Sequence, residues 1–166
     1  MRDSPPRCVV DSNVFIDFHE GGLLKAMFEL PFTFSALDVV LDELHRPDRE
    51  HLLAMELESI SASAHQVEAV VALAGIHRRP SINDLFVFVI ARAERATLVT
   101  GDRALRHLAK PKGMAVHGTL RLLDHLVRQT IVTPQRATEG LKSMLEDGRR
   151  LPDKECRERI QRWGRS

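Results

Sequence analysis

Short apolar segments alternate with segments of helical periodicity along the whole 166-residue chain. Short apolar runs are typical of strands that are buried on both faces, whereas apolar residues spaced by three and four are typical of helices. Strands are predicted at 8–10, 32–34, 57–61, 97–100 and 114–116. Strands that alternate with helices build a parallel sheet covered by helices. We therefore predict an α/β fold with a central parallel sheet.

The predicted helices follow these strands. One begins at Val14, a second carries Leu37, Val40, Leu41 and Leu44, and others are expected at about 66–75, 82–94, around Leu105, 120–127, 134–147 and 153–163. Thr133-Pro134 is a cap followed by the residue favoured in a first helical turn. We predict a main domain at 1–130 and a C-terminal helical extension at 131–166, packed on the same domain or on a partner chain.

Charge is unevenly distributed along the chain. Residues 1–83 hold 7 Lys/Arg against 13 Asp/Glu, and the rest hold 17 against 10. This asymmetry suits an acidic pocket beside a basic surface that holds a polyanion, although the two parts could simply neutralise each other. The longest uncharged apolar run, Ala69–Ile76, is too short to span a bilayer, and Met1–Arg7 does not lead into a signal peptide's apolar region. We expect a cytoplasmic protein with no membrane segment.

Several other classes of site lack their motif in this sequence. Cys8 and Cys156 are far apart and form no CxxC pair, which argues against a disulfide framework and a structural zinc site. No HExxH, Walker A or GxGxxG motif occurs. A phosphoaspartyl phosphatase would carry D-x-D after the first strand, where this chain has Asp11-Ser12-Asn13.

Four carboxylates are predicted to gather at one edge of the sheet. Asp11 and Asp102 directly follow strands, and the carboxyl ends of parallel strands border the ligand crevice. Asp84 lies in the first turn of a helix, and Glu43 lies on the flank of another. Crowded carboxylates repel one another, so such a cluster is stabilised by a divalent cation, and oxygen ligands suit Mg²⁺ or Mn²⁺. The pattern therefore indicates a metal-binding acidic pocket.

Each acid also has a purely structural interpretation. Asp11 is placed to cap the helix that follows it, and Asp102 in Thr-Gly-Asp suits a turn. Ser81 and Asp84 have the spacing of a capping box. A glutamate on a helix flank, such as Glu43, is usually solvated. Taken singly these interpretations are strong, and it is the joint pattern that favours a metal site.

The same segments resemble the four acidic motifs of PIN domains, in family order. They are Val9–Phe15, Val39–Leu44, Ser81–Ala91 and Leu98–Leu105, and the resemblance covers roughly residues 8–128. Gly118-Thr119-Leu120, followed by Thr133-Pro134 and two helices, is similar to a stand-alone PIN subfamily with a C-terminal helical pair. Some relatives have two adjacent acids where this chain has Gly101-Asp102. The choice of Glu43 over Asp42 rests on motif alignment and helix phase.

This resemblance implies a three-layer α/β/α fold and a ribonuclease activity. It implies that one or two Mg²⁺ or Mn²⁺ ions are held by the catalytic acids Asp11, Glu43, Asp84 and Asp102. Toxins of the VapC type are the largest group of the family, so the implied partners are RNA, an antitoxin protein if the chain is a toxin, and a second copy in a homodimer. A non-catalytic PIN-like module that binds RNA or protein is the alternative.

Further residues are expected to support such a site. Polar side chains beside the acids are predicted to orient them or the attacking water, or else to serve turns and caps: Ser12, Asn13 and Thr100. Basic residues after Asp102 are predicted to bind phosphates, or else to form a solvated face: Arg103, Arg106 and Lys110. The apolar helices at 66–76 and 120–127 are candidates for a dimer face unless they belong to the core.

Overall fold

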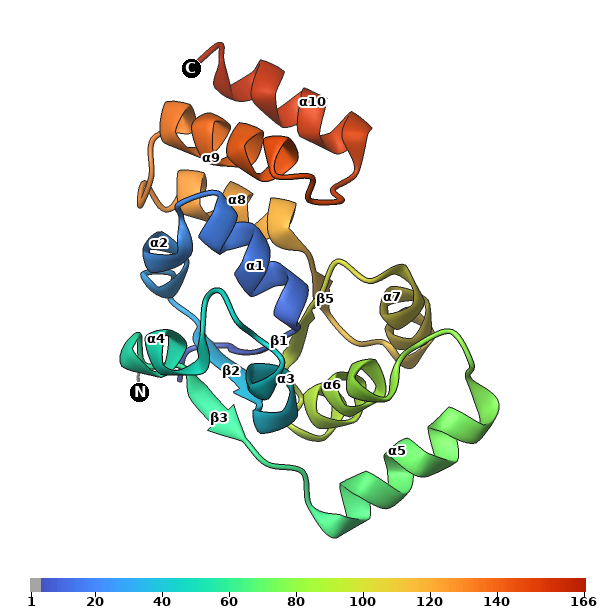
Figure 1. Ribbon diagram of the computed structural model, residues 1–166. Helices are drawn as coiled ribbons and strands as arrows, with labels where there is room; N and C mark the ends of the chain where they lie inside the picture. Colours follow the sequence, from blue (N-terminus) through green and yellow to red (C-terminus); the bar gives the residue numbers. More distant parts are fainter. Residues whose placement is uncertain (1–3) are drawn as a thin grey trace.

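A computed structural model describes residues 4–166 of the chain. Residues 1–3, on which part of the expectation for the N-terminus rests, lie outside the described residues. The elements follow in the order β1 (Arg7–Val10), α1 (Ser12–Glu20), α2 (Leu24–Phe28), β2 (Thr33–Leu37), α3 (Asp38–Asp42), α4 (Arg49–Ala54), β3 (Glu58–Ile60), α5 (Ala64–Ile76), α6 (Ile82–Ala93), β4 (Thr97–Val99), α7 (Arg103–Ala109), the 3-10 turn η1 (Lys110–Lys112), β5 (Val116–His117), α8 (Thr119–Arg128), α9 (Pro134–Glu146) and α10 (Asp153–Trp163) (Figure 1).

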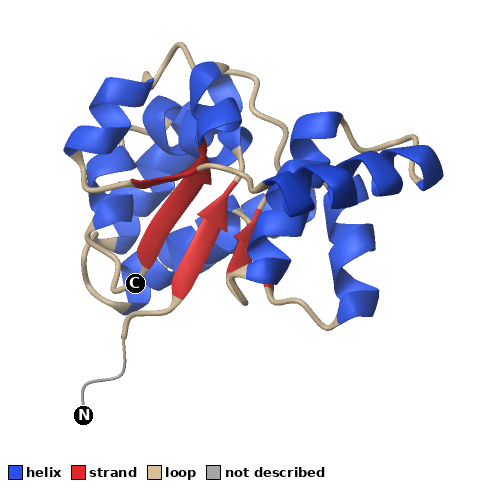
Figure 2. Cartoon of the chain, turned by 90° about the horizontal axis from the view of Figure 1, so that it is seen from below, coloured by secondary structure: helices blue, strands red, loops and turns tan. Residues whose placement is uncertain are grey.

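The five strands form one parallel sheet in the order β3-β2-β1-β4-β5. Figure 2 shows the sheet with helices around it. The predicted α/β fold with a central parallel sheet is therefore confirmed. Strand β1 lies in the middle, and its last three residues are fully buried. The order also makes β1 and β4 neighbours, so the residues that follow these two strands lie side by side.

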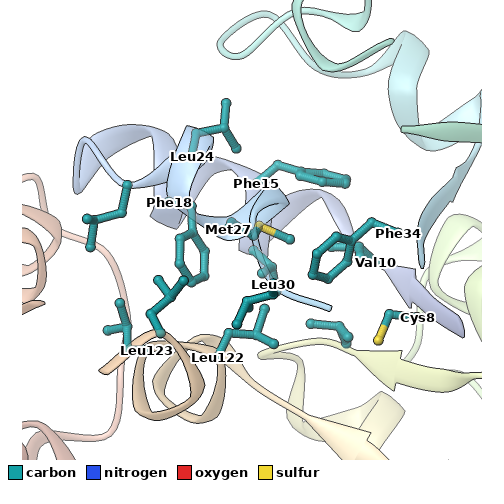
Figure 3. Close-up of a cluster of buried hydrophobic side chains, with 14 of the residues drawn as sticks. Cys8, Val10, Phe15, Phe18, Leu24, Met27, Leu30, Phe34, Leu122 and Leu123 are labelled. Carbon is teal, nitrogen blue, oxygen red and sulfur yellow. The ribbon is translucent and has the colours of Figure 1, made fainter. Parts of the chain in front are cut away.

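The two faces of the sheet are covered by separate apolar clusters. Cys8 and Val10 of β1 belong to one cluster, together with side chains of α1, α2 and α8 (Figure 3). Val9, which points to the opposite face, belongs to a second cluster that contains Val87 and Ile90 of α6. This alternation follows from the two-residue period of a strand. The result is a sheet between two helical layers.

The C-terminal helices pack on the first of these layers. Helix α9 contacts α1 and α8, and α10 contacts α9 (Figure 1). The approach of α9 to the end of α1 is close, because a Cβ on Gly140 would lie 3.0 Å from the carbonyl oxygen of Gly21. Arg159 of α10 also donates to Asp124 of α8, with Nη2 2.6 Å from Oδ2. The extension therefore forms part of one continuous core with α1 and α8.

Local details differ from the predictions where tertiary pairing overrides local pattern. Leu37, predicted on a helix, is the last residue of β2 because it pairs with Ile60 of β3. The helix that follows is correspondingly short. The last strand is Val116–His117 and not 114–116, and the short helices α2 and α4 were not predicted.

The two candidate dimer helices have different environments. Residues 120–127 lie in α8, where Leu122, Leu123 and Leu126 are buried in the core. Helix α5 instead packs against α6 at the outside of the molecule, and its Val71 and Ile76 are 66% and 74% exposed. Over residues 4–166, the structure contains no helix that is both long and apolar enough for a membrane span.

Candidate functional site

Asp11 is a buried acid at the carboxyl end of the central strand. It is the N-cap of α1, and its Oδ1 accepts a hydrogen bond from the backbone amide of Ser12 at 2.8 Å. The hydroxyl of Thr100 donates to its Oδ2 at 3.0 Å. The side chain is nevertheless short of charge compensation, since Asp11 is only 4% exposed and the groups that donate to it are neutral.

The pKa of Asp11 reflects this environment. Burial, the largest cause, and the carboxylates of Asp84 and Asp102 together raise this pKa from 3.8 to about 6, against the lowering effect of the hydrogen bonds from Thr100 and Ser12. Asp11 thus interacts electrostatically with two other predicted site residues that come from different parts of the chain. These three acids share one electrostatic environment.

Asp102 is brought to Asp11 by the pairing of β4 with β1. Val99 pairs with Val10, and the amide of Asp11 donates to the carbonyl of Val99 at 2.9 Å. The hydroxyl oxygen of Thr100 also accepts from the Asp102 amide at 3.0 Å. Thr100, which is fully buried, therefore connects the two acids. Asp102 caps α7 through Oδ1, which accepts from the Leu105 amide at 2.8 Å.

Glu43 contacts the start of α6 through Asn83, the residue before Asp84. Ser81 and Asp84 form the capping box that the spacing suggested, with Asp84 Oδ2 accepting from the Ser81 amide at 2.7 Å. Asn83, beside Asp84, donates from Nδ2 to Oε1 of Glu43, which ends the short helix α3. Asp42 instead pairs with Arg49 at 2.7 Å and is 66% exposed. Glu43, and not Asp42, lies beside the Asp84 segment.

Asp11, Glu43, Asp84 and Asp102 border one edge of the sheet, here called the acidic edge, without closing around a common point. Within residues 4–166, no three side chains of His, Cys, Asp or Glu lie close enough together to hold a metal ion. The structural interpretations are realised as well, since Asp11, Asp84 and Asp102 all make capping hydrogen bonds. The donor set is nonetheless chemically suited to Mg²⁺ or Mn²⁺, because it consists of carboxylates, whose oxygens these ions prefer and whose charges repel one another.

The three polar residues predicted to support the acids have distinct positions. Ser12 contacts Asp11 through its amide and, at 3.5 Å, its hydroxyl. Thr100 connects Asp11 with Asp102 as described. Asn13 is exposed and contacts the C-terminal extension, since its Oδ1 accepts from Arg149 Nη2 at 3.3 Å. Asn13 is thus held by a segment that is remote in sequence.

The predicted phosphate-binding residues are not equivalent. Arg103 is exposed and lines a groove together with Asp102. Arg106 is half-buried, and its Nη2 donates to the carbonyl of Thr100 at 3.0 Å. Burial lowers the pKa of Arg106. Lys110 is exposed at the start of η1, whereas Lys112 is the lysine that lines the groove.

Sequence reasoning missed a buried network that connects α1, α8 and the C-terminal extension. Asp17 is 5% exposed, and its Oδ2 accepts from Thr119 Oγ1 at 2.6 Å while its Oδ1 accepts from Arg149 Nε at 2.7 Å. The sequence does hold a signal for the burial of Asp17, because this residue follows Val14 by three positions and therefore lies on the apolar face of α1. An acid on that face requires a buried partner.

Comparison with known proteins gives a family and a fold. A family model described as PIN domain (DUF3368) matches residues 7–165, and no curated protein matches the chain. The chain is similar to the crystal structure of PAE2754 from Pyrobaculum aerophilum, with 20% identity, a TM-score of 0.52 and coverage of 75% of this chain and 97% of that one. It is also similar to VapBC2 from Rickettsia felis, solved bound to a DNA fragment from their promoter, with 18% identity, a TM-score of 0.47 and coverage of 68% and 98%.

Proposed function

Because the chain belongs to the PIN-domain family, whose members are generally nucleases, we propose that it is a divalent-metal-dependent endoribonuclease. The observation that carries the proposal is the meeting of Asp11, Asp84 and Asp102 in one electrostatic environment at the carboxyl end of the sheet. Repulsion among these acids is what a bound cation relieves. Capping alone would not require the three acids to be neighbours.

In this proposal Asp11, Glu43, Asp84 and Asp102 hold one or two Mg²⁺ or Mn²⁺ ions. Such an ion neutralises phosphate charge and lowers the pKa of a bound water. The chain's own residues supply position and charge. Thr100 connects the Asp11 carboxylate to the backbone amide of Asp102. The capping bonds leave Asp84 Oδ1 and Asp102 Oδ2 without a hydrogen-bond donor among the described residues. These oxygens are the ones we assign to metal.

The first experiment is RNA cleavage by the purified protein in Mn²⁺, with EDTA and Asp84→Asn as controls. Asparagine can still accept the amide hydrogen bond from Ser81, so this substitution preserves the cap and removes the charge. We expect both controls to abolish cleavage of single-stranded and structured RNA. Cleavage that survives in Asp84→Asn would contradict the assignment of this residue.

Glu43 and Asp42 provide a matched pair for the same assay. Glu43→Gln removes the acid beside the Asp84 segment, and Asp42→Asn removes a neighbouring acid that pairs with Arg49 on the surface. We expect a large loss of cleavage only for Glu43→Gln. Equal activities of the two variants would remove Glu43 from the site.

A non-catalytic module that binds RNA or protein is the second candidate. It is favoured by the capping bonds of the three aspartates and by the absence, within residues 4–166, of a closed group of metal ligands. Calorimetric titration with Mn²⁺ separates the candidates. A catalytic site predicts binding that weakens in Asp11→Asn and in Asp84→Asn, whereas unaltered binding in both favours the module.

We also propose two protein partners for this chain, an antitoxin and a second copy of itself. A toxin role with a small antitoxin protein is tested by inspecting and co-expressing the product of the adjacent reading frame. For a homodimer, the exposed apolar residues Val67, Val71 and Ile76 of α5 are the supporting feature. Sedimentation of the wild type and of Val71→Glu tests this, and a monomeric wild type would exclude the pairing.

A further inference from the structure

Two grooves that are rich in basic side chains border the turn that carries Asp102. The first groove has a volume of about 710 Å³ and lies between residues 76–80 and helix α7. Its basic lining consists of Arg78, Arg79, Arg103 and Lys112, and Asp102 lies in the same wall. A predicted site acid therefore opens directly onto a positively charged surface groove.

The second groove has a volume of about 590 Å³ and is bordered by the start of α7, the start of α8 and the loop that precedes α10. Its basic lining comes from these three segments and from α10 itself, and consists of Arg103, Arg106, Arg121, Arg150 and Arg159. Arg150 is contributed by the C-terminal extension. The extension thus supplies part of the wall of a groove beside the acidic edge.

The grooves meet at the turn between β4 and α7. Arg103 lines both of them, Gly101 lines the second, and Asp102 lines the first. A chain molecule that follows both grooves must therefore pass this turn. Asp102 is in turn connected to Asp11 through Thr100. The turn that both grooves share therefore carries one acid of the acidic edge, and the other three predicted site acids line neither groove.

Most of the lining arginines are free to bind an anion. Arg159 is neutralised by Asp124 at 2.6 Å, and Arg106 donates to the carbonyl of Thr100. Others are exposed and form no ion pair with any residue of 4–166: Arg78, Arg79, Arg103, Arg121 and Arg150. Their positive charges therefore add to one field along the two grooves.

The wall of the second groove is fixed in place. Arg149 anchors the loop that carries Arg150, through its bonds to Asp17 at 2.7 Å and to Asn13 Oδ1 at 3.3 Å. Gly118 leaves room for Arg106, because a Cβ at this position would overlap the Arg106 guanidinium. The two residues at the start of α8 therefore have separate structural roles: Gly118 leaves room for Arg106, and the hydroxyl of Thr119 donates to Asp17.

We propose that a single RNA strand crosses the acidic edge along both grooves. Its phosphates would contact Arg78 and Arg79 in the first groove, Arg103 at the junction, and Arg121 and Arg150 in the second. Guanidinium groups suit this role because they bind phosphate oxygens with two parallel hydrogen bonds. A flexible single strand can follow a route that turns at Arg103. The inference rests on the proposed ribonuclease function and adds the route of its substrate.

The test is binding of a fluorescein-labelled single-stranded RNA, followed by anisotropy in EDTA so that no cleavage occurs. The variants are Arg78→Ala/Arg79→Ala for the first groove and Arg121→Ala/Arg150→Ala for the second. Each pair removes two phosphate contacts, so the slope of log K against log salt should become less steep by about 1.4. The same relation gives roughly 25-fold weaker binding at about 0.1 M salt than the wild type shows.

The matched control is Arg157→Ala/Arg165→Ala, which removes two exposed arginines of the C-terminal segment that line neither groove. We expect this control to bind RNA like the wild type. The proposed route would be overturned if the groove variants bind RNA like the control, or if only one of the two groove variants binds more weakly. It would also be overturned if the wild type does not bind RNA. Cleavage in Mn²⁺ is measured separately. Binding that changes as expected without any cleavage would overturn the nuclease proposal and leave the route standing.

Discussion

Asp17 of helix α1 and Asp11, the residue that caps this helix, are two buried acids whose surroundings differ sharply. Asp17 accepts hydrogen bonds from Thr119 and from the cation of Arg149. Asp11, at the start of the helix, accepts within residues 4–166 only from the neutral donors Ser12 and Thr100, and it has Asp84 and Asp102 as neighbours. Both carboxylates are almost inaccessible to water. The fold therefore compensates the negative charge of Asp17 with Arg149 and leaves the negative charge of Asp11 without such a partner among the described residues.

The difference separates a structural acid from a candidate functional one. Burial raises the pKa of both residues, but around Asp17 the hydrogen bonds from Thr119 and Arg149 and the charge of Arg149 act in the opposite direction. Around Asp11 the neighbouring charges act in the same direction as burial. A site that is left with uncompensated negative charge is suited to a cation from solution. Experiments that treat the two acids in parallel test this distinction.

The largest expected effect is on RNA cleavage. Asp11→Asn removes a proposed metal ligand, so we expect the rate in Mn²⁺ to fall at least about a thousandfold, equivalent to about 4 kcal/mol of barrier. Asp17→Asn, assayed at a temperature where circular dichroism shows it folded, should keep the rate within about tenfold. Single-turnover cleavage measures both. Equal losses in the two variants would remove the distinction between the acids.

The second effect is on stability and concerns Arg149. Arg149→Met leaves the Asp17 carboxylate buried without its cation, so we expect the free energy of unfolding to fall by about 3 kcal/mol. Asp17→Asn/Arg149→Met should lose less than the sum of the single changes, because no buried charge is left unpaired. Urea unfolding measures these values, with Arg157→Met as the exposed control. Additive losses would show that Asp17 and Arg149 are not coupled.

How far the sequence predicted this arrangement differs between the two acids. Asp11 follows an apolar strand, and strand order in an α/β fold brings such positions together, so its neighbours could be predicted from local pattern. The partner of Asp17 could not be predicted, because Arg149 lies far along the chain in a loop without a motif. The arginine-lined grooves depend on loops in the same way. Leu37 shows the same limit within the sheet, where pairing with β3 extends a strand into a helical pattern.

The third effect is the pH dependence of stability without metal. The pKa of Asp11 in the folded protein, about 6, lies above the ordinary value of 3.8, so folding favours the protonated form. The stability that the protonated Asp11 contributes to the folded protein is fully present below about pH 4 and is lost as the pH rises through about 6. Asp11→Asn has no carboxyl group to ionise and so does not lose this stability. We expect its free energy of unfolding to rise by about 2 kcal/mol relative to that of the wild type between about pH 4 and pH 7.

Urea unfolding of both proteins in EDTA across this pH range measures the gain. Addition of Mn²⁺ above pH 6 should stabilise the wild type and not the variant, because the metal binds the ionised carboxylate. A difference between the two proteins that is independent of pH would mean that the Asp11 carboxyl has an ordinary pKa. In that case Asp11 and Asp17 would no longer differ in the way proposed here.

The smallest effect concerns Thr100, whose hydroxyl is the strongest influence that lowers the pKa of Asp11. Thr100→Val keeps the shape and removes the hydrogen bond, so the pKa of Asp11 should rise and Mn²⁺ should bind about tenfold more weakly near pH 6. At pH 8 the carboxyl is ionised in both proteins and the affinities should converge. Thr100→Ser keeps the hydroxyl and should bind as the wild type does at both values. Calorimetric titration distinguishes these cases, and a loss that is equal at pH 6 and pH 8 would mean that Thr100 acts by positioning Asp102 through its amide and not by stabilising the ionised Asp11.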